Sequence, residues 1–152
     1  MQGGTGELNL PPLNHIGVVV RDMDEVGRSL KQVLGLEFEE EFEYTATGDE
    51  VLTGEPFTLR IAAVKIGGAT YEFLQPVAGK SLWADFLESS GEGTHHVAFT
   101  VKDWAADVAR IQEGGSVMVA GATVDKFDNK RWAYFDTHIG GLIVELMEDY
   151  GL

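Results

Sequence analysis

Apolar and polar positions along the chain follow two different periods, and the order of those periods repeats once. Short apolar runs with the period of a strand are followed by a segment with helical spacing, and then by further strand-like runs. Glycines separate these segments, as expected at turns and helix ends. The pattern predicts two halves, each with the element order β-α-β-β-β.

The repeat is clearest in a segment of nine residues. Residues 14–22, with the sequence NHIGVVVRD, align with residues 95–103, HHVAFTVKD. In both segments a histidine opens an apolar strand and an aspartate closes it, at a position that favours the N-cap of a following helix. In the first half Glu25 completes a capping box with Asp22.

Each half has room for one helix and two further strands before its last strand. Helices are predicted near residues 23–33 and 104–113, and each ends at a glycine that can adopt a left-handed conformation. A shorter helix is predicted between the halves, at residues 81–89. The additional strands are predicted near residues 36–43, 57–66, 116–124 and 131–136.

The ends of the two halves also match. Residues 70–75, TYEFLQ, resemble residues 143–148, IVELME, and in each a glutamate interrupts a strand-like run after a glycine pair. Side chains alternate between the two faces of a strand, so Glu72 and Glu145 point away from their apolar neighbours. His15 does the same in its own strand. We expect the helix of each half to cover the apolar face.

The length of 152 residues fits one domain. Residues 1–12 are polar and rich in glycine, and we expect them to form a flexible tail. The rest, residues 13–152, is expected to form one domain. Its parts are module one at 13–76, a linker with a helix at 77–93, and module two at 94–148.

Composition excludes several kinds of chemistry. There is no cysteine, which rules out disulfides, zinc-thiolate sites and thiol nucleophiles. The net charge of −14 argues against binding to nucleic acids or anionic membranes. No apolar run could span a bilayer, and the first residues do not resemble a signal peptide, so we expect a cytoplasmic protein.

The repeat indicates four candidate metal ligands, namely His15, Glu72, His96 and Glu145. Taken singly, each has a commoner structural explanation, but their recurrence at matching places favours a shared ligand role. A buried glutamate also needs a cation or a proton. Two imidazoles and two carboxylates suit one divalent ion such as Mn, Fe, Co, Ni or Zn. His95 aligns with Asn14 rather than with His15, so we expect it to support the site rather than to bind the ion.

These residues resemble the vicinal oxygen chelate superfamily, which includes glyoxalase I, methylmalonyl-CoA epimerase, extradiol dioxygenases and antibiotic-resistance proteins. The resemblance covers residues 13–147. It implies an α+β fold in which two tandem βαβββ modules form a cupped mixed sheet around the metal. Residues 86–99, FLESSGEGTHHVAF, are similar to methylmalonyl-CoA epimerase, whereas residues 134–141 lack the His-Pro-Lys segment of that enzyme.

The resemblance implies an epimerase or isomerase that removes a proton next to a metal-chelated carbonyl and passes through an enolate. Glu145 is one candidate base, and the second is Glu43 or Glu50, between which the sequence does not choose. His138 is another candidate proton carrier. The substrate would be a small carbonyl compound or a thioester, and the resemblance implies a homodimer.

Three alternatives remain open at this point. A glyoxalase I-type lyase uses the same ligands on a thiol adduct. A ring-opening dioxygenase needs two histidines and one carboxylate on iron, and the glutamate at position 72 fits this class less well. A metal-free small-molecule binding protein is the third alternative, although such relatives often lack the ligands that are present here.

Overall fold

The computed structural model describes residues 10–150. Nine residues of the predicted tail, 1–9, lie outside this range. Residues 10–12 have no regular structure and lead directly into the first strand. Among the described residues, no helix is both long enough and apolar enough to cross a membrane.

The first half of the described chain contains five strands, one α-helix and a π-helical turn. They are β1 (Leu13–Val19), α1 (Met23–Ser29), η1 (Leu30–Leu34), β2 (Glu40–Ala46), β3 (Val51–Thr53), β4 (Phe57–Ile66) and β5 (Ala69–Ala78). A helix, α2 (Leu82–Ser90), joins the halves. The second half contains β6 (Gly93–Val101), α3 (Trp104–Glu113), β7 (Val117–Val124), η2 (Asp125–Phe127), β8 (Lys130–Asp136) and β9 (Ile143–Glu148).

All nine strands form one curved sheet in the order β2-β4-β5-β1-β6-β9-β8-β7-β3. In each half the first strand pairs in parallel with the last, β1 with β5 and β6 with β9. The two halves meet where β1 and β6 pair antiparallel. The predicted α+β fold with a cupped mixed sheet is confirmed.

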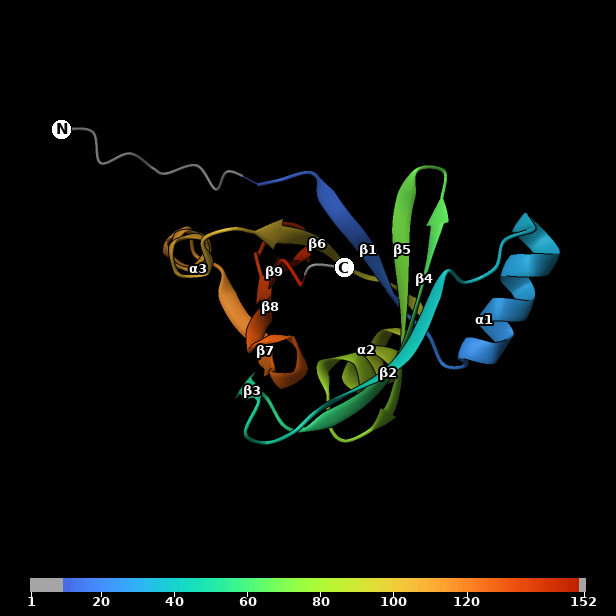
Figure 1. Ribbon diagram of the computed structural model, residues 1–152, viewed down its shortest axis with the longest axis horizontal. Coiled ribbons are helices and arrows are strands. Elements are labelled where there is room, and N and C mark those ends of the chain that lie inside the picture. The colour runs from blue at the N-terminus through green and yellow to red at the C-terminus, as the bar shows by residue number, and fades with distance from the viewer. Residues whose placement is uncertain (1–9, 151–152) are drawn as a thin grey trace.

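Helices α1 and α3 lie on opposite outer sides of the sheet, and α2 lies between its two wings (Figure 1). Each outer helix covers the apolar face of its own half, as the alternation of side chains predicts. One outer cluster joins Val20, Met23 and Ala62 beneath α1, and a second is centred on Trp104, Phe135 and Leu146 beneath α3.

A third cluster lines the inside of the cup. It draws residues from both halves, and Trp83 of α2 is its largest buried side chain, with 1% exposed. Helix α2 therefore closes one end of the cup with apolar side chains. The inner face of the central strands, where the candidate ligands lie, is left facing the space between the wings.

Two local predictions differ from the structure. The segment expected as a strand from residue 36 enters the ladder only at Glu39, whose N–H donates to the carbonyl of Ala63. The preceding Phe38 packs in the cluster beneath α1 instead. The first helix ends in the π-helical turn η1 rather than as α-helix, and Gly35 ends it with a φ of 69°.

Strand β3 was not predicted at all. It has only three residues and pairs with β7, a strand of the other half. Because β2 and β3 lie at opposite edges of the sheet, the segment between them connects the two wings. The indole N–H of Trp132 adds a second link by donating to the hydroxyl of Tyr44 at 3.1 Å. The curved sheet is thereby almost closed.

The two aspartates of the repeat cap their helices as predicted. Asp22 accepts from the backbone N–H groups of Asp24 and Glu25, and Asp103 accepts from that of Ala106. We predict that Asp103→Ala lowers the free energy of unfolding by about 1 kcal/mol, measured by urea denaturation, because the helix loses this acceptor. Asp103→Asn is the control and should retain most of the stability. Equal midpoints for all three proteins would show that the cap contributes nothing.

Candidate metal centre

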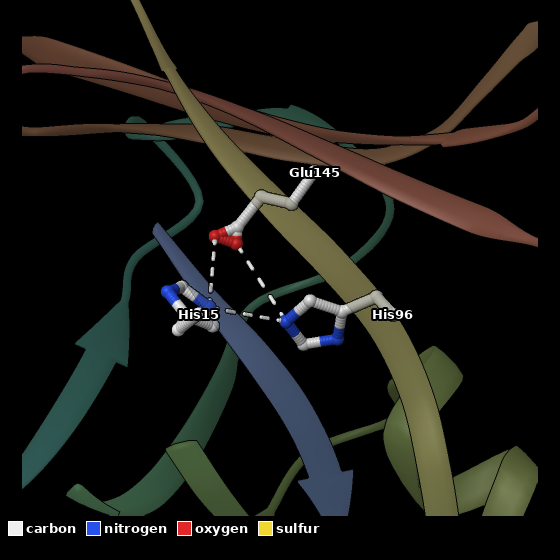
Figure 2. A group of neighbouring side chains, drawn as sticks. All are labelled: His15, His96 and Glu145. Carbon is white, nitrogen blue, oxygen red and sulfur yellow. Dashed lines mark hydrogen bonds and ion pairs between the residues drawn. The ribbon is translucent and has the colours of Figure 1, made fainter. Parts of the chain in front are cut away.

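Three buried side chains from three neighbouring strands meet at the inner face of the sheet (Figure 2). His15 comes from β1, His96 from β6 and Glu145 from β9, and at most 6% of any of them is exposed. The two Nε2 atoms are 3.3 Å apart. The Glu145 oxygens lie 3.9 Å from Nε2 of His15 and 3.8 Å from Nε2 of His96. The sequence places these groups 49 to 130 positions apart, and the strand order brings them together.

Strand register explains why the groups converge. Gly17 pairs with His96 across the two central strands, and Ala98 pairs with Glu145. The imidazole of His96 lies over the backbone of Gly17. A Cβ atom at position 17 would overlap ring atoms Cε1, Nε2 and Nδ1 of that imidazole. A glycine is therefore required opposite His96 for the ring to occupy this place.

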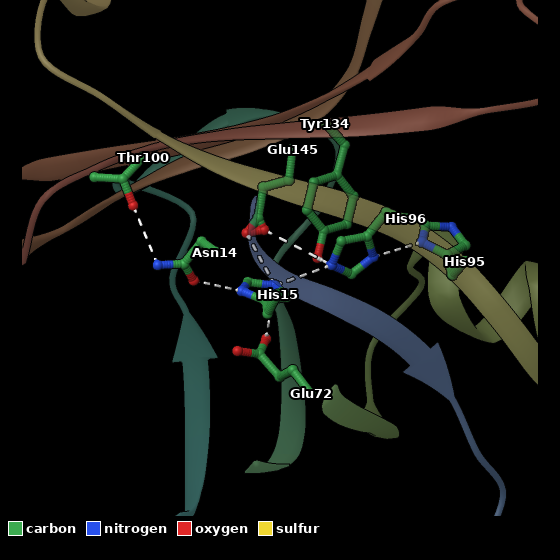
Figure 3. Close-up of polar contacts among 8 residues, drawn as sticks. All are labelled: Asn14, His15, Glu72, His95, His96, Thr100, Tyr134 and Glu145. Carbon is green, nitrogen blue, oxygen red and sulfur yellow. Dashed lines mark hydrogen bonds and ion pairs between the residues drawn. The ribbon is translucent and has the colours of Figure 1, made fainter. Parts of the chain in front are cut away.

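Glu72 approaches from the other side of His15, at 3.7 Å between its Oε1 and Nε2 of the histidine (Figure 3). It lies on β5, beside Gly17 in the parallel ladder. About 22% of its side chain is exposed, which is more than for the other three groups. Glu72 thus faces both the buried cluster and the open cavity.

The outer nitrogen of each imidazole has a partner from the residue just before it in the sequence (Figure 3). Nδ1 of His15 lies 2.8 Å from Oδ1 of Asn14, whose amide nitrogen donates to Thr100. Nδ1 of His96 lies 3.0 Å from Nδ1 of His95. When Asn14 accepts a hydrogen bond from Nδ1 of His15, and His95 accepts one from Nδ1 of His96, both ligand rings carry their proton on Nδ1. Each ring then presents a lone pair on Nε2. Asn14 and His95 are aligned in the repeat, so the two modules support their histidines in the same way.

Burial sets the charge states around the cluster. Burial and the negative charge of Glu72 raise the pKa of Glu145 well above its usual value, and a hydrogen bond from Tyr134 lowers it only in part. Burial and the neighbouring imidazoles depress the pKa of His96, and burial lowers the pKa of His95 to about 4. Near neutral pH the imidazoles of His95 and His96 are therefore neutral and able to share one proton between their Nδ1 atoms.

The donor set suits a divalent ion. An ion about 2.1 Å from each donor separates adjacent donors by about 3.0 Å in octahedral and about 3.4 Å in tetrahedral geometry. The spacings of 3.3 to 3.9 Å among these groups are close to that range. Nitrogen and carboxylate donors together fit ions of intermediate hardness. His15, His96 and Glu145 could hold such an ion, with Glu72 closing in as a fourth donor.

The cluster forms part of the wall of a cavity of about 480 Å³ inside the cup. Aromatic and aliphatic side chains make up much of the wall, including Trp83 and Trp132. His15, Glu72 and Glu145 line it directly. The size is typical of small-molecule sites, which measure roughly 300–1,000 Å³.

A family model described as the Glyoxalase/Bleomycin resistance protein/Dioxygenase superfamily matches residues 14–135. The chain belongs to this superfamily. The resemblance seen in the sequence to the vicinal oxygen chelate superfamily is thereby confirmed.

Two curated relatives and one solved structure show what the chain is similar to. It is 28% identical over 145 residues to a 2-epi-5-epi-valiolone epimerase from Actinomyces sp, which covers 90% of this chain and 79% of the relative. It is 24% identical over 140 residues to the uncharacterized protein YqjC from Bacillus subtilis (strain 168), covering 91% and 93%. The crystal structure of methylmalonyl-CoA epimerase from Mycobacterium tuberculosis matches with a TM-score of 0.65 at 25% identity, covering 91% of this chain and 88% of that one.

The structure does not bring all the predicted bases of this superfamily member into the cavity. Glu43 lies on β2 between Phe42 and Tyr44, which both line the cavity, so Glu43 points to the outer face. Glu50 lies in the turn before β3 and does not line the cavity, although its charge acts on the Tyr44 hydroxyl. His138 is an exposed turn residue paired with Asp136 at 3.5 Å.

Glu40 and Tyr134 line the cavity close to the cluster, and neither was named as a site residue from the sequence. Glu40 occupies the inward face of β2, and Ala63 of β4 pairs with Glu40 on one side and with Glu72 on the other. Glu40 shares its face of β2 with Phe42 and Tyr44, opposite to Glu43. Tyr134 of β8 lies opposite Glu145, and its hydroxyl is 3.3 Å from Nε2 of His96. Nothing in the sequence around Tyr134 indicated that its hydroxyl would lie beside His96.

We predict that Gly17→Ala lowers the free energy of unfolding by about 1–3 kcal/mol, because the added methyl displaces the buried His96 ring. Gly93→Ala is the matched control, since Gly93 lies in the same strand pair and its Cβ position is open. Urea denaturation measures stability, and the NMR signals of the His96 ring report its position. An unshifted His96 signal in Gly17→Ala would contradict the packing described here.

Proposed function

We propose that this chain is a divalent-metal-dependent epimerase or isomerase, which moves a proton at the carbon next to a chelated carbonyl. One observation carries the proposal. Three buried donor groups from three strands lie within 4.8 Å of one another at the wall of an open cavity. A buried acid beside two imidazoles is costly unless a cation binds there, and the adjoining space can admit a small substrate.

In this proposal His15, His96 and Glu145 hold the ion, and Glu72 joins them. A divalent ion bound there would supply Lewis acidity to a substrate carbonyl and so make the neighbouring carbon more acidic. Asn14 and His95 orient the two imidazoles through their Nδ1 atoms. The apolar cluster around Trp83 excludes water from the inner end of the cavity.

Two carboxylates on opposite walls are placed to move the proton. Glu145 stands on β9, where burial and the charge of Glu72 raise its pKa, so that its carboxylate binds a proton more strongly than an exposed one. Glu40 stands on β2, two strands beyond Glu72 across Ala63, and faces the same cavity. An epimerase that works with two bases needs one on each face of the reacting carbon. We assign these roles to Glu145 and Glu40, in place of Glu43 and Glu50.

The relatives support an epimerase over the other enzyme classes. One curated relative is named as a 2-epi-5-epi-valiolone epimerase and one solved structure as a methylmalonyl-CoA epimerase. A glyoxalase I-type lyase is the second candidate, because the same four donors and a neighbouring carboxylate serve its chemistry too. Incubation of the metal-loaded protein with methylglyoxal and glutathione separates the two classes, since only the lyase forms a thioester from them.

The metal centre yields a prediction on protons. Because the pKa of Glu145 is raised in the protein without metal, ion binding should displace its proton, and affinity for Co²⁺ should rise with pH until that pKa is passed. Calorimetric titrations in buffers of different ionisation enthalpy count the released protons. Glu145→Gln should release fewer protons and weaken binding by more than about tenfold. An unchanged affinity in Glu145→Gln would remove Glu145 from the site.

The two-base assignment yields a prediction on stereochemistry. In deuterated water the wild type should incorporate deuterium at the reacting carbon of its substrate and invert it. Glu40→Gln should lower inversion by about 10²–10⁴-fold while Co²⁺ affinity and exchange with retention persist, because Glu145 still acts on one face. Glu43→Gln, on the outer face of the same strand, is the control and should behave as wild type. Inversion at the wild-type rate in Glu40→Gln would refute its role.

A further inference from the structure

The polar part of the cavity wall is acidic, and this bears on what the proposed epimerase accepts. Glu40 of β2 and Glu39 just before this strand line it, and Asp149 lines it from beyond β9. Lys65 is the single lysine or arginine among the lining residues that the structure describes. Glu148 also lines the wall, but Arg131 pairs with it through two hydrogen bonds of 3.0 Å. The outer part of the wall thus carries net negative charge.

This charge disfavours a phosphate-bearing carrier. A divalent ion at the centre would neutralise the two negative charges of Glu72 and Glu145. It would therefore leave no positive charge to offset those of Glu39 and Glu40. The whole chain carries a net charge of −14. A substrate with several phosphate charges, such as a coenzyme A thioester, would be repelled over the Debye length of about 8–10 Å. A neutral substrate meets no such barrier.

Aromatic side chains stand next to these carboxylates. Phe42 lies between Glu40 and Tyr44 on the inward face of β2, and it is 42% exposed although it faces the cavity. Tyr44 stacks on Phe57, with ring centroids 5.8 Å apart and an angle of 16° between the planes. An aromatic face packs on the C–H face of a saturated ring, while a neighbouring carboxylate accepts hydrogen bonds from its hydroxyl groups. Together they form a wall suited to a polyhydroxylated ring.

The hydroxyl of Tyr150 lacks a hydrogen-bond partner at the cavity, among the residues that the structure describes. It is buried, and Tyr150 lines the cavity wall. Buried hydroxyls are normally paired, so an unpaired one beside a cavity indicates a ligand that completes it. A substrate hydroxyl can both donate to and accept from Tyr150.

We propose that the substrate is a neutral, polyhydroxylated ring ketone, bound with its ring against Phe42 and its hydroxyls toward Glu39, Glu40 and Tyr150. This rests on the proposed function, because the carbonyl is placed at the metal centre. The reaction class stays the same, since the proton is removed from and returned to the carbon beside the carbonyl, with no net change in atoms.

The test compares binding of three probes to the Co²⁺-loaded protein by calorimetry. Scyllo-inosose is a neutral six-membered polyol ketone, cyclohexanone has the ring without hydroxyls, and methylmalonyl-CoA carries the phosphates. We expect scyllo-inosose to bind at least about tenfold more tightly than either of the others. Tighter binding of methylmalonyl-CoA, or equal binding of cyclohexanone, would overturn the substrate class.

Variants of one strand locate the contact. Phe42→Ala should weaken scyllo-inosose binding by about tenfold, and circular dichroism checks that this exposed substitution leaves the fold intact. Glu39→Lys should strengthen methylmalonyl-CoA binding in a manner that salt abolishes. Glu43→Gln, on the outer face, should change neither. A Phe42→Ala protein with wild-type affinity for scyllo-inosose would overturn the placement of the ring.

Deuterium exchange separates this proposal from the one on which it rests. Binding of scyllo-inosose that depends on Phe42, without exchange at its α-carbons, would refute the epimerase and leave the substrate class standing. Deuterium exchange on methylmalonyl-CoA, without binding of scyllo-inosose, would refute the substrate class and leave the epimerase standing.

Discussion

The antiparallel pairing of β1 with β6 is the constraint on which the rest of the structure depends. It is the seam between the two halves, and it fixes Gly17 opposite His96. Once that register is set, each parallel partner strand carries its glutamate to the same place, β5 with Glu72 and β9 with Glu145. A shift by one residue would turn either histidine to the face covered by a helix.

The cluster where β1 meets β6 buries polar, ionisable side chains, which protein interiors usually exclude. A carboxyl group and two imidazoles are buried in contact, and the hydroxyl of Tyr134 lies 3.3 Å from Nε2 of His96. Such an arrangement is stable only with a proton or a cation among the groups. The cost of burying these groups without a counter-charge thus favours metal binding.

Sequence periodicity was enough to predict the order of the elements and the faces on which the candidate ligands lie. It succeeded because the duplication shows each module twice, so that His15 and His96 confirm each other. It failed where contacts between distant segments determine the local structure. Three residues of β3 form a strand only because β7 lies beside them. Glu43 was named as a candidate base, but the inward face of β2 carries Phe42 and Tyr44, so Glu43 lies on the outer face.

The separation of the apolar residues into three clusters has a consequence for how such a protein can change. The clusters beneath α1 and α3 touch only the outer faces of the sheet, whereas the inner cluster shares Trp132 and Tyr134 with the cavity wall. Substitutions in the outer clusters can raise or lower thermal stability while leaving ligand preference alone. Any repacking of the inner cluster reshapes both together, so new specificities in this scaffold should arise with outer changes that restore the lost stability.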